Sequence, residues 1–349
     1  MVSREGWVIL RSGFPKLFLR RQHRIWPAAG AAGYPLAASA VVAPGRAFWS
    51  HAPIEVLWPS RQEGMLRIAV TGASGRIGGQ VVRLVAAEQQ HQVVALSRRG
   101  LLPGQWPPSV SARTADYADP QALGVALRDV DTLVFVSSDG PVAEVMIHHQ
   151  NVIRGADAGG VTHIVALSGL DADLYSPFCY GVSYGYTERL LAESGCAVSI
   201  ARASIYSEFF LGFLARARAS GQLRLPAADG RISLVSRSDV AQCLAALALA
   251  PAKGRHHDIT GSRSLGLDAI AAAGTREWGT PLTYVNITPG EHCAEMAAAG
   301  EDPWWMYAYS TMFASIRGQR WAAVSGEVQR LTGRPPTPIR TALARYEAV

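Results

Sequence analysis

LRIAVTGASGRIGG, which spans residues 66–79, decides the fold of this 349-residue chain. Its run 68–70 is short, apolar and bounded by turn residues, as in a buried strand. Apolar side chains then recur at helical spacing over residues 81–88. The stretch between these two patterns is rich in glycine. We therefore expect a strand, a glycine turn and a helix in immediate succession.

The glycines of this turn fall in the pattern G-x-x-G-x-x-G. We expect Gly72 to allow a tight turn out of the strand, Gly75 to let backbone approach a pyrophosphate, and Gly78 to allow close packing of helix on strand. Phosphates would bind the free N–H groups of the helix N-terminus, where the dipole favours anions. A glycine-rich turn without a ligand is the alternative, and the flanking patterns argue against it. The candidate cofactor-binding residues here are Gly72, Ala73, Ser74, Gly75, Arg76 and Ile77.

The end of the next expected strand, residues 92–97, indicates which dinucleotide binds. NAD-binding folds place an Asp or Glu about 20 residues after the glycines, where it holds the ribose 2′-OH. Arg98 occupies that position relative to Gly78. An arginine suits a 2′-phosphate, because its guanidinium forms bidentate hydrogen bonds and stacks on adenine. The pattern favours NADP(H) over NAD(H), with a surface arginine pair at a strand end as the alternative.

Strand-like and helix-like patterns alternate from residue 65 to about residue 202. Further strands are expected at residues 111–115, 131–138, 162–168 and 197–202. This alternation predicts an α/β fold, a doubly wound parallel sheet of Rossmann type with helices on both faces. A smaller α+β lobe follows. We therefore assign residues 65–250 to an NAD(P)-binding domain and residues 251–349 to a C-terminal substrate lobe, with a contribution from residues 204–230.

Polar residues that follow the expected strands are further candidates for the cofactor site, because ligands of such sheets bind at the carboxyl ends of the strands. Ser137 and Ser138 end the strand at 131–138 and are expected beside the cofactor. Asp116 follows the strand at 111–115, and the pattern favours an adenine contact and a turn cap equally. His148 and His149 are expected on a solvated helix face.

The net charge of +6 is concentrated in residues 1–64, which hold eight Lys/Arg and three Asp/Glu and so carry +5. The remaining chain has 25 basic and 24 acidic residues, or +1. A nearly neutral body argues against a nucleic-acid groove. The four cysteines are scattered without a C-x-x-C pair, so we expect neither a zinc site nor a disulfide framework, but reduced thiols in the cytoplasm.

Residues 1–64 differ in composition from the rest of the chain. Residues 25–45 are uncharged but contain three prolines, which makes them a poor membrane span. Arg20-Arg21 and the alanine-rich run allow a twin-arginine or transit peptide as an alternative. We expect a basic extension that is disordered or non-native, with Met65 as the natural start of the folded unit.

Five blocks of sequence together resemble the NmrA-like group of atypical short-chain dehydrogenase/reductases. They are TGASGRIG at 71–78, SRR at 97–99, HIVALSGL at 163–170, TERLLAESG at 187–195 and SIARASIYSEF at 199–209. The resemblance covers about residues 65–290. The group includes quinone-oxidoreductase-like and triphenylmethane-reductase-like enzymes, and redox-sensing regulators that bind the cofactor without turnover. The resemblance therefore implies an NAD(P)-binding protein, and it leaves a homodimer open.

The resemblance also implies a catalytic pattern, which this chain breaks. The superfamily uses a serine, a tyrosine and a lysine four residues after the tyrosine, and the lysine lowers the tyrosine pKa. Ser168 and Tyr180 match the first two, but Tyr184 stands in the place of the lysine. We expect the pKa of Tyr180 to stay near about 10, which makes it a poor acid at neutral pH. The alternative is that Tyr180 and Tyr184 only pack or line a pocket.

These observations predict an NADPH-dependent oxidoreductase that transfers hydride to an electrophile needing little protonic help, such as a quinone or another flat molecule. Aromatic residues at 206–213 and 304–313 could form its pocket or belong to the core, with Tyr184 and Tyr206 as the pocket candidates. The alternative function is a non-catalytic NADP(H)-binding redox sensor. We expect a small aromatic or quinone-like substrate and no nucleic acid, membrane or metal.

Overall fold

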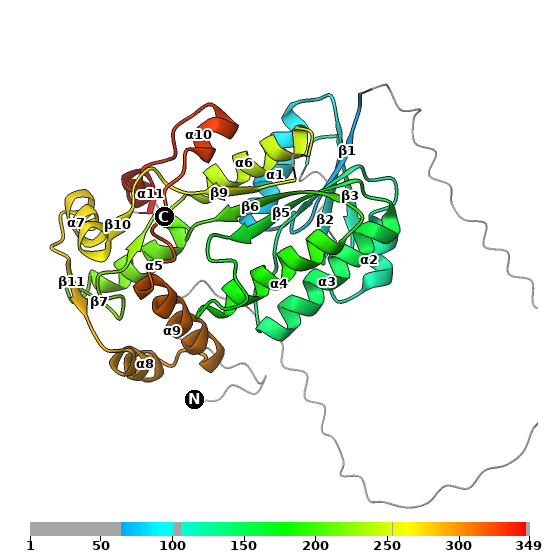
Figure 1. The fold of residues 1–349 in the computed structure, drawn as a ribbon. Helices are drawn as coiled ribbons and strands as arrows, with labels where there is room; N and C mark the ends of the chain where they lie inside the picture. Colours follow the sequence, from blue (N-terminus) through cyan, green and yellow to red (C-terminus); the bar gives the residue numbers. More distant parts are fainter. Residues whose placement is uncertain (1–63, 101–105, 253, 347–349) are drawn as a thin grey trace, which may run out of the picture. The chain divides into compact units, whose positions relative to one another are not determined.

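A parallel sheet forms the centre of the alternating strand–helix part of the chain (Figure 1). The structure is a computed structural model and describes residues 64–100, 106–252 and 254–346. Seven strands pair in the order β3-β2-β1-β4-β5-β6-β9, all in parallel. Their bounds are β1 Arg67–Val70, β2 Gln92–Ser97, β3 Val110–Thr114, β4 Thr132–Phe135, β5 His163–Gly169, β6 Ala197–Ala203 and β9 His256–Ile259. The order reverses between β1 and β4, so the predicted doubly wound sheet is confirmed.

Helices cover both faces of this sheet (Figure 1). One face carries α1 (Arg76–Ala87) and α6 (Arg237–Leu249), which pack against each other, with α10 (Glu327–Thr332) beside α6. The other face carries α2 (Pro120–Ala126), α3 (Val142–Gly159) and α4 (Cys179–Glu193). The apolar stripe of α1 explains its placement, because Val81, Val82 and Val85 are all fully buried against the strands.

A second hydrophobic cluster packs the helices and small sheets of the C-terminal part, and it also includes Val145 of α3 and residues 178–180 at the start of α4. The helices of this part are α5 Ser207–Ala217, α7 Leu267–Trp278, α8 Pro289–Ala298, α9 Pro303–Arg317 and α11 Ile339–Tyr346. Two small sheets pair β8 (Arg231–Ile232) with β10 (Leu265–Gly266) and β7 (Gln222–Leu225) with β11 (Thr283–Asn286). Phe213 packs edge-on against Tyr309 and Phe313, with ring centroids 5.7 and 5.6 Å apart. Much of both predicted aromatic sets therefore belongs to this core.

The predicted domain boundary at residue 250 does not coincide with the end of the main sheet. Strand β9 lies beyond residue 250 and yet completes the main sheet, so the chain returns to the first domain after leaving it. The division into 65–250 and 251–349 stays a prediction. Of the predicted extension 1–64, all but Gly64 lies outside the described residues.

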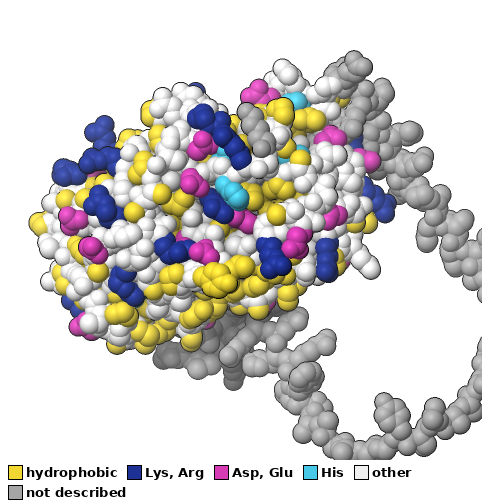
Figure 2. Space-filling model, in the orientation of Figure 1, with side chains coloured by type: hydrophobic (Ala, Val, Ile, Leu, Met, Phe, Trp, Pro, Cys, Tyr) yellow, Lys and Arg dark blue, Asp and Glu magenta, His cyan; other side chains and the backbone are white. Residues whose placement is uncertain are grey.

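Surface charges on the face drawn in Figure 2 are mixed, with basic and acidic side chains interspersed. No helix among the described residues combines the length and the apolar character needed to cross a membrane.

The sequence pattern predicts a helix over residues 184–194, but helix α4 begins five residues earlier, at Cys179 rather than Tyr184. Gly181 and Gly185 argue against a helix by propensity. The structure explains why glycine occupies both positions. A Cβ on Gly181 would lie 2.6 Å from the Asp171 carbonyl oxygen, and a Cβ on Gly185 would lie 2.8 Å from the Asp173 carbonyl carbon. The loop after β5 packs directly on the helix backbone. Tyr180 and Tyr184 consequently lie one turn apart on the same helix.

Candidate cofactor and active site

The glycine turn between β1 and α1 has the geometry that its sequence predicts. Gly72 adopts the left-handed conformation, with φ of +61°. Gly75 is the N-cap of α1 and provides no side chain to cap it. A Cβ on Gly78 would lie 2.4 Å from the Gly72 carbonyl oxygen, so only glycine fits there. The turn is anchored to the sheet, because Ala73 N–H donates to the Leu96 carbonyl at 3.0 Å.

The predicted phosphate-binding residues differ in exposure. Ser74, Gly75 and Arg76 are exposed, whereas Ala73 and Ile77 are buried and can offer a ligand only their backbone. The start of α1 thus presents backbone N–H groups and the Arg76 side chain to solvent, without a competing side-chain cap. This arrangement suits a diphosphate at a helix N-terminus.

The end of β2 adjoins the glycine turn. Ser97 Oγ lies 3.4 Å from Ser74 Oγ and donates to the Arg99 carbonyl at 2.7 Å. Arg98 follows directly and is exposed. The structure therefore brings Arg98 to the same sheet edge as the turn. Asp116 accepts a hydrogen bond from Ala118 N–H at 3.0 Å, so its side chain forms the turn cap that was one of the two readings of this residue.

The two predicted serines follow β4, which ends at Phe135 and not at residue 138 as the sequence predicts. Ser137 Oγ donates to the Leu167 carbonyl at 2.5 Å and ties β4 to β5. Ser138 Oγ is buried and has no hydrogen-bond partner in the described part of the chain. A buried hydroxyl without a partner is costly unless a ligand satisfies it. The orphaned Ser138 hydroxyl and the glycine turn both fit a dinucleotide lying across this edge.

His149 corrects the expectation of a solvated face at this part of α3. It is fully buried, and its Nε2 accepts from the Ser138 N–H at 3.1 Å. Its Nδ1 consequently donates to Thr187 Oγ1 at 2.7 Å. Burial lowers the His149 pKa to about 3, so the ring is neutral at physiological pH. The buried positions Val145, His149 and Val152 follow helical spacing, and that pattern could have revealed it.

Tyr180 is held by backbone rather than by a cation. Its hydroxyl donates to the Gly140 carbonyl at 2.9 Å and accepts from the Gly140 N–H at 3.0 Å. Burial raises its pKa to about 12, which corrects the expected value near 10. Gly140 reaches this position with φ of +116°, a conformation that favours glycine.

The two pocket candidates, Tyr184 and Tyr206, lie near each other, and Tyr184 lies next to Tyr180. Tyr184 stacks on Tyr180 with ring centroids 6.4 Å apart and an interplanar angle of 29°. Burial raises the Tyr184 pKa, and the proximity of Tyr206 raises it further. Trp304 meets Tyr180 edge-on, with ring centroids 6.2 Å apart. The carboxyl ends of β5 and β6 therefore meet an aromatic surface.

Ser168 is engaged elsewhere. Its hydroxyl donates to Glu188 Oε1 at 2.6 Å, and the same carboxylate pairs with Arg202 and lies 3.1 Å from His256 Nε2. The predicted serine thus belongs to a buried ionic cluster between α4 and β6. Nothing in this geometry directs its proton toward a substrate carbonyl beside Tyr180, so its catalytic role stays a prediction that the contacts do not favour.

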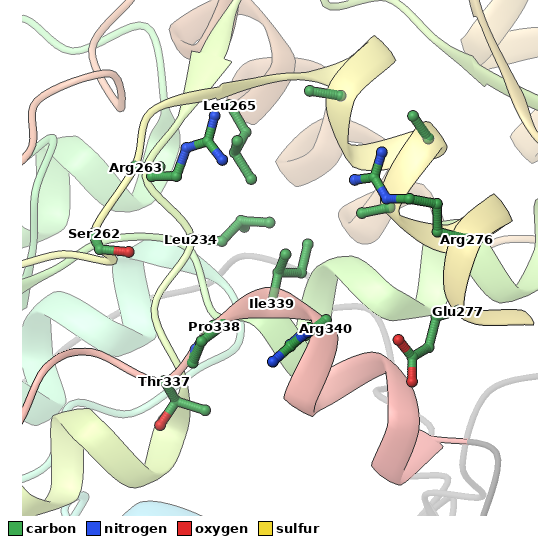
Figure 3. A pocket seen from close by; sticks show the side chains of 13 residues that line it. Leu234, Ser262, Arg263, Leu265, Arg276, Glu277, Thr337, Pro338, Ile339 and Arg340 are labelled. Atoms are coloured by element: carbon green, nitrogen blue, oxygen red, sulfur yellow. The ribbon is translucent and has the colours of Figure 1, made fainter.

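A separate hollow of about 550 Å³ lies in the C-terminal lobe (Figure 3). Arg263 and Arg276 approach it from opposite sides, and Leu234, Leu265 and Ile339 form apolar walls. None of the predicted site residues lines it. It is therefore distinct from the cofactor edge described above.

Comparison with known proteins agrees with the fold and the glycine turn. A family described as NAD(P)H-binding matches residues 72–251, just over half of the chain. Quinone oxidoreductase 2 of Escherichia coli is 33% identical over 239 residues, covering 67% of this chain and 82% of that protein. An NAD(P)H azoreductase of Xenophilus azovorans is 27% identical over 270 residues, covering 77% and 93%.

A solved structure extends the similarity to three dimensions. The NADPH-dependent quinone oxidoreductase of Escherichia coli, complexed with NADPH, superposes with a TM-score of 0.74 at 28% identity. The match covers 80% of this chain and 99% of that one. The predicted relationship to NmrA-like reductases is confirmed.

Proposed function

This chain belongs to the NAD(P)H-binding family, and from that premise we propose that it is an NADPH-dependent reductase of quinones or similarly flat electrophiles. The relatives named as quinone oxidoreductase and azoreductase support a reductase. The choice of quinones over carbonyl compounds is inferred from the site. The observation that supports this choice best is the Tyr180 hydroxyl, which forms two hydrogen bonds with the Gly140 backbone and has a raised pKa.

We assign the cofactor to the carboxyl edge of β1, β2 and β4. The N–H groups at the start of α1 and the Arg76 side chain would bind the diphosphate. Arg98 would bind the 2′-phosphate, which is the basis for preferring NADPH. The Ser138 hydroxyl would gain the partner that it lacks within the described chain.

The aromatic surface would receive the substrate. Bound NADPH supplies a hydride, and a quinone that accepts it becomes a hydroquinone anion, which takes its proton from water. Tyr180, Tyr184 and Tyr206 would hold the flat ring and exclude water from one side of it. This chemistry requires no tyrosine–lysine proton relay.

The test is NADPH oxidation, followed by loss of absorbance, against a panel of quinones and aldehydes. We expect turnover of quinones and little or none of aldehydes. Strong aldehyde reduction would contradict the reading of Tyr180.

A second candidate function shares the same supporting observation. A site without a proton relay also fits a redox sensor that binds NADP(H) and does not turn over. Tight NADPH binding without turnover of any panel member would favour the sensor over the reductase.

A further inference from the structure

The N-termini of α1 and α6 lie side by side. Arg76 is the first residue of α1, after its N-cap Gly75, and Arg237 is the first residue of α6, after its N-cap Ser236. Gln80 Nε2 donates to Ser238 Oγ at 2.8 Å and joins the first turns of the two helices. Two helix N-termini, each beginning with an arginine, therefore converge beside the glycine turn.

Arg237 is held in a defined position. Its backbone N–H lies 3.1 Å from both carboxylate oxygens of Glu208. Its guanidinium carbon lies 5.3 Å from the centre of the Tyr206 ring. Cation–π stacking leaves the edge of the guanidinium, with its N–H groups, free to donate. The Tyr206 ring thus positions the Arg237 side chain without using its hydrogen-bond donors.

The local charges favour an incoming anion. Burial lowers the Arg237 pKa, and the Glu208 carboxylate opposes this effect. The charge of Arg76 lowers the Arg237 pKa further, which indicates that the two guanidinium groups are near enough to repel each other. Within the described part of the chain, neither guanidinium lies within ion-pair distance of a carboxylate. The Glu208 carboxylate partly offsets these charges, but it accepts from the Arg237 backbone N–H rather than from the guanidinium, so the two adjacent guanidinium groups still favour an anion between them.

We propose that Arg237 is a further cofactor-binding residue that closes on the diphosphate from the α6 side, opposite Arg76. The proposal rests on the cofactor site of the proposed function. Arginine recognises phosphate oxygens in bidentate fashion, and the start of α1, which has no side-chain cap, adds the positive end of a helix dipole. NADPH and NADH share the diphosphate, so Arg237 contributes to affinity for both. Arg98, in contrast, would bind the 2′-phosphate, which NADPH carries and NADH lacks.

Small fragments of the cofactor separate these two contacts. ADP carries the diphosphate without the 2′-phosphate, whereas 2′-AMP carries a 2′-phosphate without a diphosphate. We expect Arg237→Gln to weaken binding of ADP, NADH and NADPH by about tenfold or more, which corresponds to about 1.4 kcal/mol. Binding of 2′-AMP is expected to stay within about twofold, because the lost contact lies elsewhere. Titration calorimetry on the full chain measures all four.

Two further variants control the experiment. Arg334→Gln removes an equally charged, exposed side chain beyond α10 and is expected to leave all four affinities unchanged. Tyr206→Leu removes the platform while keeping Arg237, and we expect a smaller loss of ADP affinity than in Arg237→Gln. Thermal unfolding of each variant shows whether the fold persists.

Several results would overturn the proposal. Unchanged ADP affinity in Arg237→Gln is one, and an equal loss of ADP and 2′-AMP affinity, which indicates a general disturbance, is another. A raised KM for an anionic quinone with unchanged ADP binding would assign Arg237 to the substrate instead. Failure of the unmutated chain to bind ADP would also exclude it. Absence of quinone turnover with the ADP effect intact would refute only the reductase function.

Discussion

Replacing Tyr180 by phenylalanine separates the two chemistries that this fold can support. The hydroxyl forms two hydrogen bonds with Gly140, and burial raises its pKa from 10.0 to about 12. Each pKa unit corresponds to about 1.4 kcal/mol, so proton release is harder by roughly 3 kcal/mol than for an ordinary tyrosine. A proton donor with that handicap contributes little at neutral pH.

We therefore expect Tyr180→Phe to keep quinone reduction within roughly tenfold, or about 1.4 kcal/mol in the barrier. Stability is expected to fall by about 1–3 kcal/mol, because the Gly140 N–H and carbonyl lose their partner. The variant thus loses more in folding than in catalysis. A catalytic tyrosine would show the reverse.

The assay compares initial rates of NADPH oxidation with one quinone and one aldehyde, alongside thermal unfolding. Tyr284→Phe is the matched control, since its hydroxyl lies 3.2 and 3.1 Å from the carbonyl oxygens of Leu225 and Ala228 in the other lobe. The reasoning fails if quinone turnover drops by about a hundredfold or more in Tyr180→Phe while NADPH affinity is retained. Aldehyde reduction that is strong in the unmutated protein and vanishes in the variant would refute it equally.

Three other predictions follow from the site. Arg98→Asp is expected to weaken NADPH binding tenfold or more relative to NADH binding, because a charged hydrogen bond contributes about 1.5–3 kcal/mol. Equal affinities of the unmutated protein for the two cofactors, measured by titration, would contradict this. Gly78→Ala, whose Cβ would meet backbone at 2.4 Å, is expected to abolish cofactor binding, whereas Gly195→Ala, where a Cβ meets nothing within 4 Å, is the tolerated control. His149 has a folded-state pKa of about 3, below its ordinary 6.5. Its stabilising contribution is therefore complete above pH 6.5 and is lost as pH falls, by up to about 1.4 kcal/mol per pH unit. Urea unfolding should show a smaller change in the free energy of unfolding between pH 7 and pH 5 in His149→Gln than in the unmutated protein, and an identical change would refute the assignment.

The parts of the site that local backbone chemistry determines could be predicted from the sequence. Gly72 needs a left-handed conformation and Gly78 has no room for a Cβ, so their spacing alone indicated the turn. Arg98 follows a strand end, and its place was fixed once the strand was recognised. These features depend on a few neighbouring residues.

Features that depend on distant segments were missed. The start of α4 depends on a loop that packs on Gly181 and Gly185, and sequence propensity opposes a helix there. Ser168 matches a catalytic position in the sequence pattern, and that role stays a prediction, but the pattern does not predict that its hydroxyl donates to Glu188, twenty residues away. The sequence does not single out Arg237, because its position is defined by contact with the ring of Tyr206, which precedes a different helix. Each of these contacts is tertiary, and no periodic pattern reports it.

Tyr206 connects the two halves of the site because it takes part in both. It follows β6, its backbone pairs with Val235 just before α6, and its ring supports the Arg237 guanidinium. Any movement of Arg237 toward a diphosphate therefore acts on a ring close to Tyr184. The Ser168 hydroxyl instead donates to Glu188, which pairs with Arg202. Under the proposed function, cofactor binding would position an aromatic surface rather than a proton relay, and substrate choice would then follow planarity and electron affinity more than the basicity of a carbonyl oxygen.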